Sequence, residues 1–340
     1  MDTQALSAIA QALVAPRKGI LAADESSGTI KKRFDSIGAE STEDRRRDYR
    51  EMLFTTKGAA DYISGVILFD ETLRQNAKDG TPLVQVLEQQ GIIPGIKVDL
   101  GAKPLPAADG ETVTEGLDGL RERLSEYHGL GARFAKWRAT YSITDTLPSR
   151  YCIDVNAHAL ARYAALCQEA GIVPIVEPEV LMDGGHTIGR SDEVTTAVLE
   201  ALFAALYEQR VYLEGSLLKP NMVLSGYSGA QQASVEEVAG ATIRCFLNTV
   251  PAAVPGIVFL SGGQTDELAT AHLDAMNRRG PLPWQLSFSY GRALQSAALQ
   301  AWKGDAANVD AGRAAFLHRA RLNSLARSGS YSPDMERAAS

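Results

Sequence analysis

The chain has 340 residues, of which 45% are hydrophobic, and this composition suits one large or two medium globular domains. Its formal net charge of -7 argues against nucleic acids and anionic membranes as general partners, and no apolar stretch is long enough to cross a bilayer. The three cysteines, Cys152, Cys167 and Cys245, lack a CxxC spacing and are typical of the reduced core thiols of a cytoplasmic protein.

The two ends of the chain differ in pattern. Near the amino terminus, Leu6, Ile9, Ala10 and Leu13 recur at helical spacing, which predicts an amphipathic helix rather than a signal peptide. From about residue 329 the chain is polar, and we expect a mobile tail there. No linker or internal repeat separates these ends, so residues 1–340 are interpreted as a single domain.

Eight short apolar runs between these ends are typical of buried strands. They cover residues 18–23, 63–69, 92–99, 133–141, 172–179, the run that ends at Lys219, 256–261 and 284–290. Helical patterns separate them, including one from Ser234 to about Asn248 that begins with a capping box formed by Ser234 and Glu237. Two further helices are expected around residues 293–302 and 311–325.

This alternation indicates parallel strands joined by helical crossovers. Eight units predict an α/β fold, a closed (β/α)8 TIM barrel rather than an open sheet. In such a barrel, functional residues gather at the carboxyl ends of the strands. Those ends carry Asp24, Lys97, Asp99, Lys136, Arg138, Glu177, Glu179, Lys219, Ser261 and Arg292.

Several of these charged residues occur in pairs two positions apart. Side chains alternate along a strand, so Lys136 and Arg138 share one face, as do Glu177 and Glu179. For any single pair, a structural ion pair is the simpler explanation. Because charged groups recur at the same relative position on several strands, the whole set favours catalysis over coincidence.

Lys219 stands directly before Pro220, where a strand should end because proline has no N–H for the sheet. A desolvated lysine near another cation can lose its proton and attack a carbonyl carbon to form a Schiff base. Taken alone, Lys219 is better explained as a side chain that reaches solvent from a strand end. If Lys136 lies nearby, however, its charge is expected to lower the pKa of Lys219.

Three carboxylates are candidates for the proton transfers that such a mechanism needs. Glu177 and Glu179 could act while the carbinolamine forms and loses water, and Asp24 is a further candidate base. The five histidines, in contrast, show no pair at the spacing of a metal site. We therefore expect neither a bound metal nor a cofactor.

Two groups of residues could bind anions. The segments Ser261-Gly262-Gly263 and Tyr290-Gly291-Arg292 follow the last two predicted strands, the usual phosphate site of such barrels. In isolation, the first segment would be explained as a plain turn. Two anion sites on either side of a lysine suggest a substrate that is phosphorylated at both ends. The second group comprises Ser26, Thr29, Arg33, Lys97 and Arg138.

These residues lie in segments that resemble the class I fructose-bisphosphate aldolases. The matches arrive in the family's order and extend to about Tyr331, and together they are highly specific. They are GILAADES (19–26), GIKVD (95–99), FAKWR (134–138), IVEPE (175–179), LEGSLLKPNMV (213–223), FLSGG (259–263) and FSYGR (288–292).

The resemblance implies that Lys219 forms the Schiff base with the substrate ketone and that Glu177 does the acid–base work at that carbon, assisted by Asp24, Lys136 and Glu179. It also implies metal-independent cleavage of fructose 1,6-bisphosphate to dihydroxyacetone phosphate and glyceraldehyde 3-phosphate, commonly by a homotetramer. The phosphate next to the ketone would be held by Ser261, Gly262 and Arg292, and the far phosphate by Ser26, Thr29, Arg33, Lys97 and Arg138.

Two features depart from the family pattern. Animal members end in a tyrosine that shuttles a proton, whereas this sequence ends at Ser340, so we expect that device to be missing. Leu100 stands where many relatives have a lysine. The alternatives are another Schiff-base barrel, such as a transaldolase-like enzyme, and a barrel that serves as a scaffold without catalysis. The first needs a single phosphate site, and the second should have lost a catalytic residue.

Overall fold

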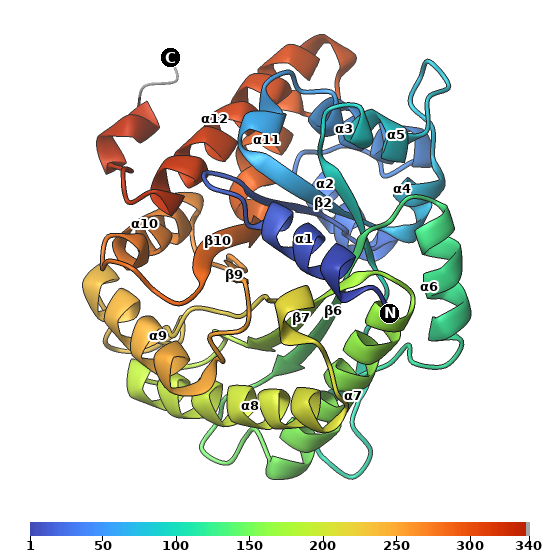
Figure 1. The fold of residues 1–340 in the computed structure, drawn as a ribbon. Helices are drawn as coiled ribbons and strands as arrows, with labels where there is room; N and C mark the ends of the chain where they lie inside the picture. The colour runs from blue at the N-terminus through green and yellow to red at the C-terminus, as the bar shows by residue number, and fades with distance from the viewer. Residues whose placement is uncertain (338–340) are drawn as a thin grey trace.

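Eight parallel strands close into a barrel in the order β1-β10-β9-β8-β7-β6-β3-β2 (Figure 1). The computed structural model describes residues 1–337. The predicted TIM barrel is confirmed, and all eight predicted strands are present. They are β1 (Gly19–Ala23), β2 (Ile63–Leu68), β3 (Ile93–Lys97), β6 (Phe134–Tyr141), β7 (Val173–Val180), β8 (Leu217–Leu218), β9 (Gly256–Phe259) and β10 (Gln285–Tyr290).

Helices surround the barrel (Figure 1), and each long helix packs on the strands or helices that neighbour it. The capping box predicted for α9 is present, because Ser234 and Glu237 each bond the other's backbone N–H. The helices are α1 (Thr3–Leu13), α2 (Ser27–Asp35), α3 (Glu43–Phe54), α4 (Asp70–Arg74), α5 (Leu83–Glu88), α6 (Leu120–Gly129), α7 (Arg150–Glu169), α8 (Ile188–Glu208), α9 (Val235–Thr249), α10 (Asp266–Asn277), α11 (Arg292–Trp302) and α12 (Val309–Arg327).

The amino-terminal helix α1 closes one end of the barrel (Figure 1). Its buried residues Leu6, Ala10 and Leu13 belong to the same apolar cluster as inward-facing strand residues such as Ile175 and Val258. A larger apolar core fills the layer between the strands and the outer helices. Because α1 seals the amino-terminal end with apolar groups, charged side chains are accommodated at the opposite, carboxyl end of the strands.

The structure differs from the sequence prediction in three local features. Helix α2 was not predicted, because only Ile30 and Phe34 on it are buried and the remaining residues give no clear apolar period. The hairpin of β4 (Ala102–Pro104) and β5 (Thr112–Thr114) was also missed, since these strands are short and mostly exposed. The sixth barrel strand, β8, has only two residues because a short 3₁₀ helix, Leu213–Gly215, precedes it.

The carboxyl-terminal segment contains a short 3₁₀ helix, Pro333–Arg337. Tyr331 is buried, and its backbone N–H donates to Asp274 at 2.8 Å. The mobility of the tail remains a prediction, and the expected absence of a terminal tyrosine concerns residues 338–340, which lie outside the described part. Within residues 1–337, no helix is both long and apolar enough to cross a membrane.

The barrel wall should be sensitive to a single added methyl group at Gly95. Gly95 of β3 is paired with Phe134 of β6, and a Cβ at Gly95 would overlap the Phe134 ring. Overpacking of this kind should lower the free energy of unfolding of Gly95→Ala by about 1–3 kcal/mol, measured by urea titration. In the control Gly129→Ala, no heavy atom lies within 4 Å of the new methyl group, so stability should hold or rise. Equal stability of the two variants would contradict this account of the wall.

Candidate active site

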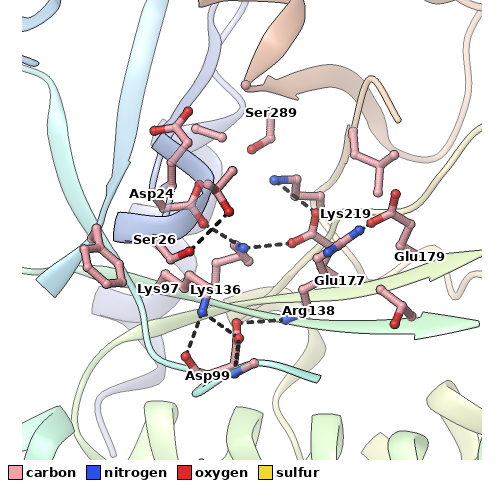
Figure 2. Close-up of a pocket in the computed structure, with 18 of the residues that line it drawn as sticks. Asp24, Ser26, Lys97, Asp99, Lys136, Arg138, Glu177, Glu179, Lys219 and Ser289 are labelled. Carbon is pink, nitrogen blue, oxygen red and sulfur yellow. Dashed lines mark hydrogen bonds and ion pairs between the residues drawn. The ribbon is translucent and has the colours of Figure 1, made fainter. Parts of the chain in front are cut away.

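A cavity of about 570 Å³ opens at the carboxyl ends of the barrel strands. Most of the residues predicted from the sequence line it, although they come from segments spread over nearly the whole chain (Figure 2). The predicted residues on its wall are Asp24, Ser26, Thr29, Arg33, Lys97, Lys136, Arg138, Glu177, Glu179, Lys219, Ser261, Gly262, Gly291 and Arg292.

At the centre of the cavity, four charged groups alternate in sign. Lys219 Nζ lies 3.2 Å from one oxygen of Glu177, whose other oxygen lies 3.2 Å from Lys136 Nζ. Lys136 in turn contacts Asp24 at 2.7 Å (Figure 2). Lys136, Glu177 and Lys219 are each at most 4% exposed, so these charges are compensated mainly by one another. Because neighbouring groups are so close, the charge of each of the four side chains affects the charge state of the next.

Burial and charge act in opposite directions on the pKa values of this cluster. Burial alone would raise the pKa of Asp24, but Lys136 and Lys219 outweigh it and hold that pKa well below its ordinary value. Burial also opposes ionisation of Glu177, and the same two lysines bring its pKa below the ordinary value. Burial would lower the pKa of Lys136, yet the two carboxylates raise it well above the usual range. Lys136 is therefore a permanent cation near neutral pH.

The local backbone explains why these side chains converge. Arg138 and Glu177 are register partners on β6 and β7, so alternation turns Lys136 and Glu177 toward the same cavity. The backbone N–H of Lys219 donates to the Val176 carbonyl at 2.8 Å and continues the pairing of β8 by one residue. Pro220, which has no N–H to donate, follows directly. Lys219 therefore projects from the point where the strand ends.

Two further ion pairs flank the central cluster. The Arg138 guanidinium donates a hydrogen bond to Glu179, so Glu179 is engaged with a cation on the cavity wall. Lys97 Nζ lies 2.6 Å from the Asp99 carboxylate and 2.7 Å from its backbone carbonyl oxygen (Figure 2). These contacts hold Lys97 and Arg138 in place, with Lys97 partly and Arg138 substantially accessible from the cavity.

The loop after β9 and the start of α11 provide backbone donors on one side of Lys219. Gly262 has a φ of 28°, in the left-handed region that favours glycine, and its carbonyl accepts a hydrogen bond from Tyr227 at 2.8 Å. Helix α11 begins at Arg292, so its first N–H groups and the Arg292 side chain lie at the edge of the cavity. Helix N-termini and glycine-rich loops favour anions. The predicted near anion site is thus geometrically possible.

The other side of the cavity is formed by the amino-terminal end of α2. Ser26 and Thr29 approach each other at 3.1 Å between their hydroxyl oxygens, and both line the cavity. Arg33, however, donates to Glu25 at 2.5 Å, a partner that sequence reasoning missed. Glu25 also accepts a hydrogen bond from Gln295 at 2.8 Å. Arg33 is therefore oriented by a buried carboxylate at the edge of this second anion site.

Two predicted site residues do not line the cavity. Tyr290 points toward the helix layer, where its hydroxyl donates to the Ala269 carbonyl at 3.0 Å. Its neighbour Ser289 faces the cavity instead, because successive side chains of β10 alternate. Gly263 lies behind Gly262 and against Tyr227. The role of Tyr290 as part of the segment Tyr290-Gly291-Arg292 stays a prediction, while Ser289 is a cavity residue that the sequence analysis did not name.

The charged groups at the site do not resemble a metal centre. Within residues 1–337, no cluster of three or more His, Cys, Asp or Glu side chains is arranged to hold a metal ion. Each cavity carboxylate described above contacts a lysine or arginine at the distance of an ion pair. The lysine and arginine side chains thus compensate the charges of these carboxylates.

Comparison with known proteins identifies relatives along nearly the whole chain. Residues 5–340 match a family model described as "Fructose-bisphosphate aldolase class-I". A protein from Xanthomonas campestris pv. campestris, named "Probable fructose-bisphosphate aldolase class 1", is 60% identical over 97% of this chain and 99% of its own length. "Fructose-bisphosphate aldolase 4, cytosolic" from Arabidopsis thaliana is 53% identical over 98% of this chain and 85% of its own length.

A solved structure shares the fold. The fructose-bisphosphate aldolase of Plasmodium falciparum, determined with TRAP and a small-molecule inhibitor, superposes with a TM-score of 0.96. It is 51% identical, and the match covers 97% of this chain and 96% of that chain. At this identity and coverage, the similarity extends beyond the general barrel architecture.

The cluster itself makes a testable prediction about stability. Lys136→Met would leave Asp24 and Glu177 buried without their shared cation, so the free energy of unfolding at pH 7 should fall by about 3–5 kcal/mol. In the wild-type protein, the low pKa values of these carboxyls stabilise the fold above their unfolded pKa of about 4, and this stabilisation is lost on acidification.

In the variant, burial without Lys136 should raise both carboxyl pKa values, so the folded state should bind protons more tightly than the unfolded chain. The difference in the free energy of unfolding between wild type and variant should therefore become smaller as the pH falls from 7 to about 5, measured by urea titration. Lys103→Met, at an exposed residue of β4, serves as the control. A loss that stays constant or grows on acidification would contradict the role given to Lys136.

Proposed function

The chain belongs to the class I fructose-bisphosphate aldolase family, and on this premise we propose that Lys219 is the Schiff-base nucleophile. The protein is a carbon–carbon lyase that reversibly cleaves fructose 1,6-bisphosphate to dihydroxyacetone phosphate and glyceraldehyde 3-phosphate through a lysine Schiff base. This membership decides against the transaldolase-like enzyme and the non-catalytic barrel considered from the sequence. The proposals below assign the steps of that reaction to individual residues.

The observation that carries this proposal is the contact between Lys219 and Glu177 at the cavity centre. Lys219 is 4% exposed, and its Nζ lies 3.2 Å from Glu177. Lys136, the nearest rival, contacts two carboxylates and has a strongly raised pKa, so it is a poor nucleophile. Lys97 is tied to Asp99 by two short contacts. Lys219, with one carboxylate partner, is the lysine best suited to attack a carbonyl carbon.

Glu177 is proposed as the acid–base group of Schiff-base formation. Lys219 gives a proton to Glu177, and the neutral amine attacks the ketone carbon. The proton that the nitrogen loses moves to the ketone oxygen to give a carbinolamine, and Glu177 then gives its proton to the hydroxyl that leaves as water. The nitrogen lone pair then forms the C=N bond of the iminium. Lys136 balances the charge of Glu177 throughout these transfers. Glu179, held by Arg138, is proposed to assist at the edge of the cavity.

Carbon–carbon cleavage requires a base for the hydroxyl next to the breaking bond. Asp24 is proposed for this step or for assisting Glu177, since its low pKa keeps it ionised and it lines the same cavity. As the hydroxyl proton leaves, its electrons form the aldehyde carbonyl, and the electrons of the broken bond move to the iminium nitrogen. The product left on Lys219 is an enamine, which is released after protonation and hydrolysis.

Two phosphate sites are proposed on opposite sides of Lys219. The near site comprises Ser261, Gly262, Gly291 and Arg292, with backbone donors from Gly263 and Tyr290 as its outer members. The far site comprises Ser26, Thr29, Arg33, Lys97 and Arg138. Support comes from the glycine conformation at Gly262, the start of α11, and the cationic side chains on the opposite wall.

We also propose that the protein acts as a cytoplasmic homotetramer, in which residues 1–340 form one barrel domain. The family resemblance supports the tetramer. The name of the Arabidopsis relative and the three buried, unpaired cysteines support the cytoplasmic location. Neither nucleic acid nor membrane is proposed as a partner, in line with the net negative charge.

Borohydride trapping tests the assignment of the nucleophile. An iminium is reducible, so borohydride added with dihydroxyacetone phosphate should produce a stable adduct that peptide mapping locates on Lys219. Lys219→Ala should abolish trapping, because no other group supplies the imine. Lys136→Ala should slow trapping without moving the label, since the cluster loses a cation but keeps its nucleophile. A label on Lys97 or Lys136, with Lys219 unmodified, would refute the assignment.

A second prediction concerns the far phosphate site. Removing one charge-assisted contact in Arg138→Ala should cost about 1.5–3 kcal/mol in kcat/KM for fructose 1,6-bisphosphate. The loss for fructose 1-phosphate should be much smaller, because that sugar lacks the far phosphate. Arg292→Ala is the matched control on the near site and should impair both sugars equally. An equal loss for both sugars in Arg138→Ala would exclude Arg138 from the far site.

A further inference from the structure

Arg319 is a buried arginine of α12 whose guanidinium contacts three separate segments. Its side chain is only 4% exposed. Nε donates to the Ala293 carbonyl at 3.2 Å, and Nη2 donates to the Asp266 carbonyl at 2.9 Å. Nη1 contacts both oxygens of Glu336, at 2.7 and 2.6 Å. A planar guanidinium with several donors can satisfy all three segments at once, whereas an ammonium group of similar charge cannot.

The two carbonyls lie at the beginnings of α10 and α11. Asp266 is the first residue of α10, three positions after Gly263, and Ala293 directly follows Arg292 at the start of α11. Arg319 Nη2 also contacts Thr270 Oγ1 at 2.6 Å in the first turns of α10. One side chain outside the cavity therefore links the helices that begin directly after the two near-phosphate loops.

The third side of Arg319 is occupied by the carboxyl-terminal segment. Tyr331 donates its hydroxyl proton to Glu336 at 2.8 Å, and Tyr331 N–H donates to Asp274 of α10. Glu336 is the acidic partner that compensates the buried charge of Arg319. The link between the two helices thus also includes the segment that follows α12.

We propose that Arg319 is a positioning residue that fixes the spacing of the two near-phosphate loops, and that Glu336 completes this link from the carboxyl-terminal segment. The proposal rests on the proposed function, in which these loops hold the phosphate next to the ketone. Arg319 does not line the cavity, so its effect on the substrate must pass through the backbone of α10 and α11. It should therefore affect phosphate recognition and leave the nucleophile unaffected.

The experiment compares borohydride trapping of dihydroxyacetone phosphate with trapping of dihydroxyacetone, which has no phosphate. In Arg319→Lys, the single ammonium cannot span the Ala293 and Asp266 carbonyls. The dihydroxyacetone phosphate concentration for half-maximal trapping should rise about tenfold, because a small loop displacement weakens several contacts together. The value for dihydroxyacetone should not change. Glu336→Gln should raise the phosphate-dependent value in the same direction but by less, since both carbonyl contacts remain.

Arg327→Lys provides the matched control, because Arg327 is a second buried arginine of α12 that donates to carbonyls. Its carbonyl acceptors, Val14 and Lys18, and its side-chain acceptor, Gln285, lie at the amino-terminal end of the barrel, opposite the loops in question. This variant should lose stability to a similar extent but should trap both compounds as the wild type does. Two results would overturn the inference. One is a shift in the half-maximal trapping concentration in Arg327→Lys that equals the shift in Arg319→Lys. The other is unchanged trapping of dihydroxyacetone phosphate in both Arg319→Lys and Glu336→Gln.

No adduct on wild-type Lys219 with either compound would overturn the proposed function itself.

Discussion

The site depends on keeping four charged groups together in one cavity, where Lys136, Glu177 and Lys219 are almost fully buried. Asp24, Lys136, Glu177 and Lys219 alternate in sign, and neighbouring groups lie 2.7 to 3.2 Å apart. Any one of them, buried alone, would destabilise the fold by several kcal/mol, in the order of magnitude known for unpaired buried charges. Each of the four therefore needs its neighbours in place. The barrel meets this need because the neighbouring strands β6, β7 and β8 bring Lys136, Glu177 and Lys219 together. Asp24 reaches Lys136 from the end of β1, which β2 and β3 separate from β6.

The rest of the structure supports this arrangement by dividing the barrel into an apolar and a charged half. Helix α1 fills the amino-terminal end of the barrel with Leu6, Ala10 and Leu13, so the charged cluster lies above a packed apolar layer. At the other end, loops and helix starts supply donors that remain accessible from the cavity. The apolar packing around α1 and the charged site thus lie at opposite ends of the barrel axis.

Much of this could be predicted from the sequence because strand ends are easily recognised. The pairs Lys136/Arg138 and Glu177/Glu179 were assigned to one face from their spacing alone, and both pairs do line the cavity. Spacing alone has a limit at Ser289 and Tyr290 of β10, since alternation says that neighbours face opposite ways but not which of them faces inward, and here Ser289 lines the cavity. Contacts between residues that lie far apart in the sequence were also not predicted. The contacts of Arg319 with Ala293 and Asp266 span 26 and 53 residues and leave no local pattern.

The geometry also changes the physical explanation of how Lys219, the proposed nucleophile, could lose its proton. The sequence suggested direct repulsion from Lys136, but Glu177 lies between the two lysines and contacts both. A proton that leaves Lys219 can pass to Glu177, so the neutral amine and the neutral acid form together and the buried cluster keeps its net charge of zero. Lys219 is one of the two main cations that lower the pKa of Glu177, and its deprotonation removes that influence. In the proposed mechanism, this transfer raises the proton affinity of Glu177, so Glu177 holds the proton until it passes to the leaving hydroxyl. Lys136 and Asp24 stay paired beside it.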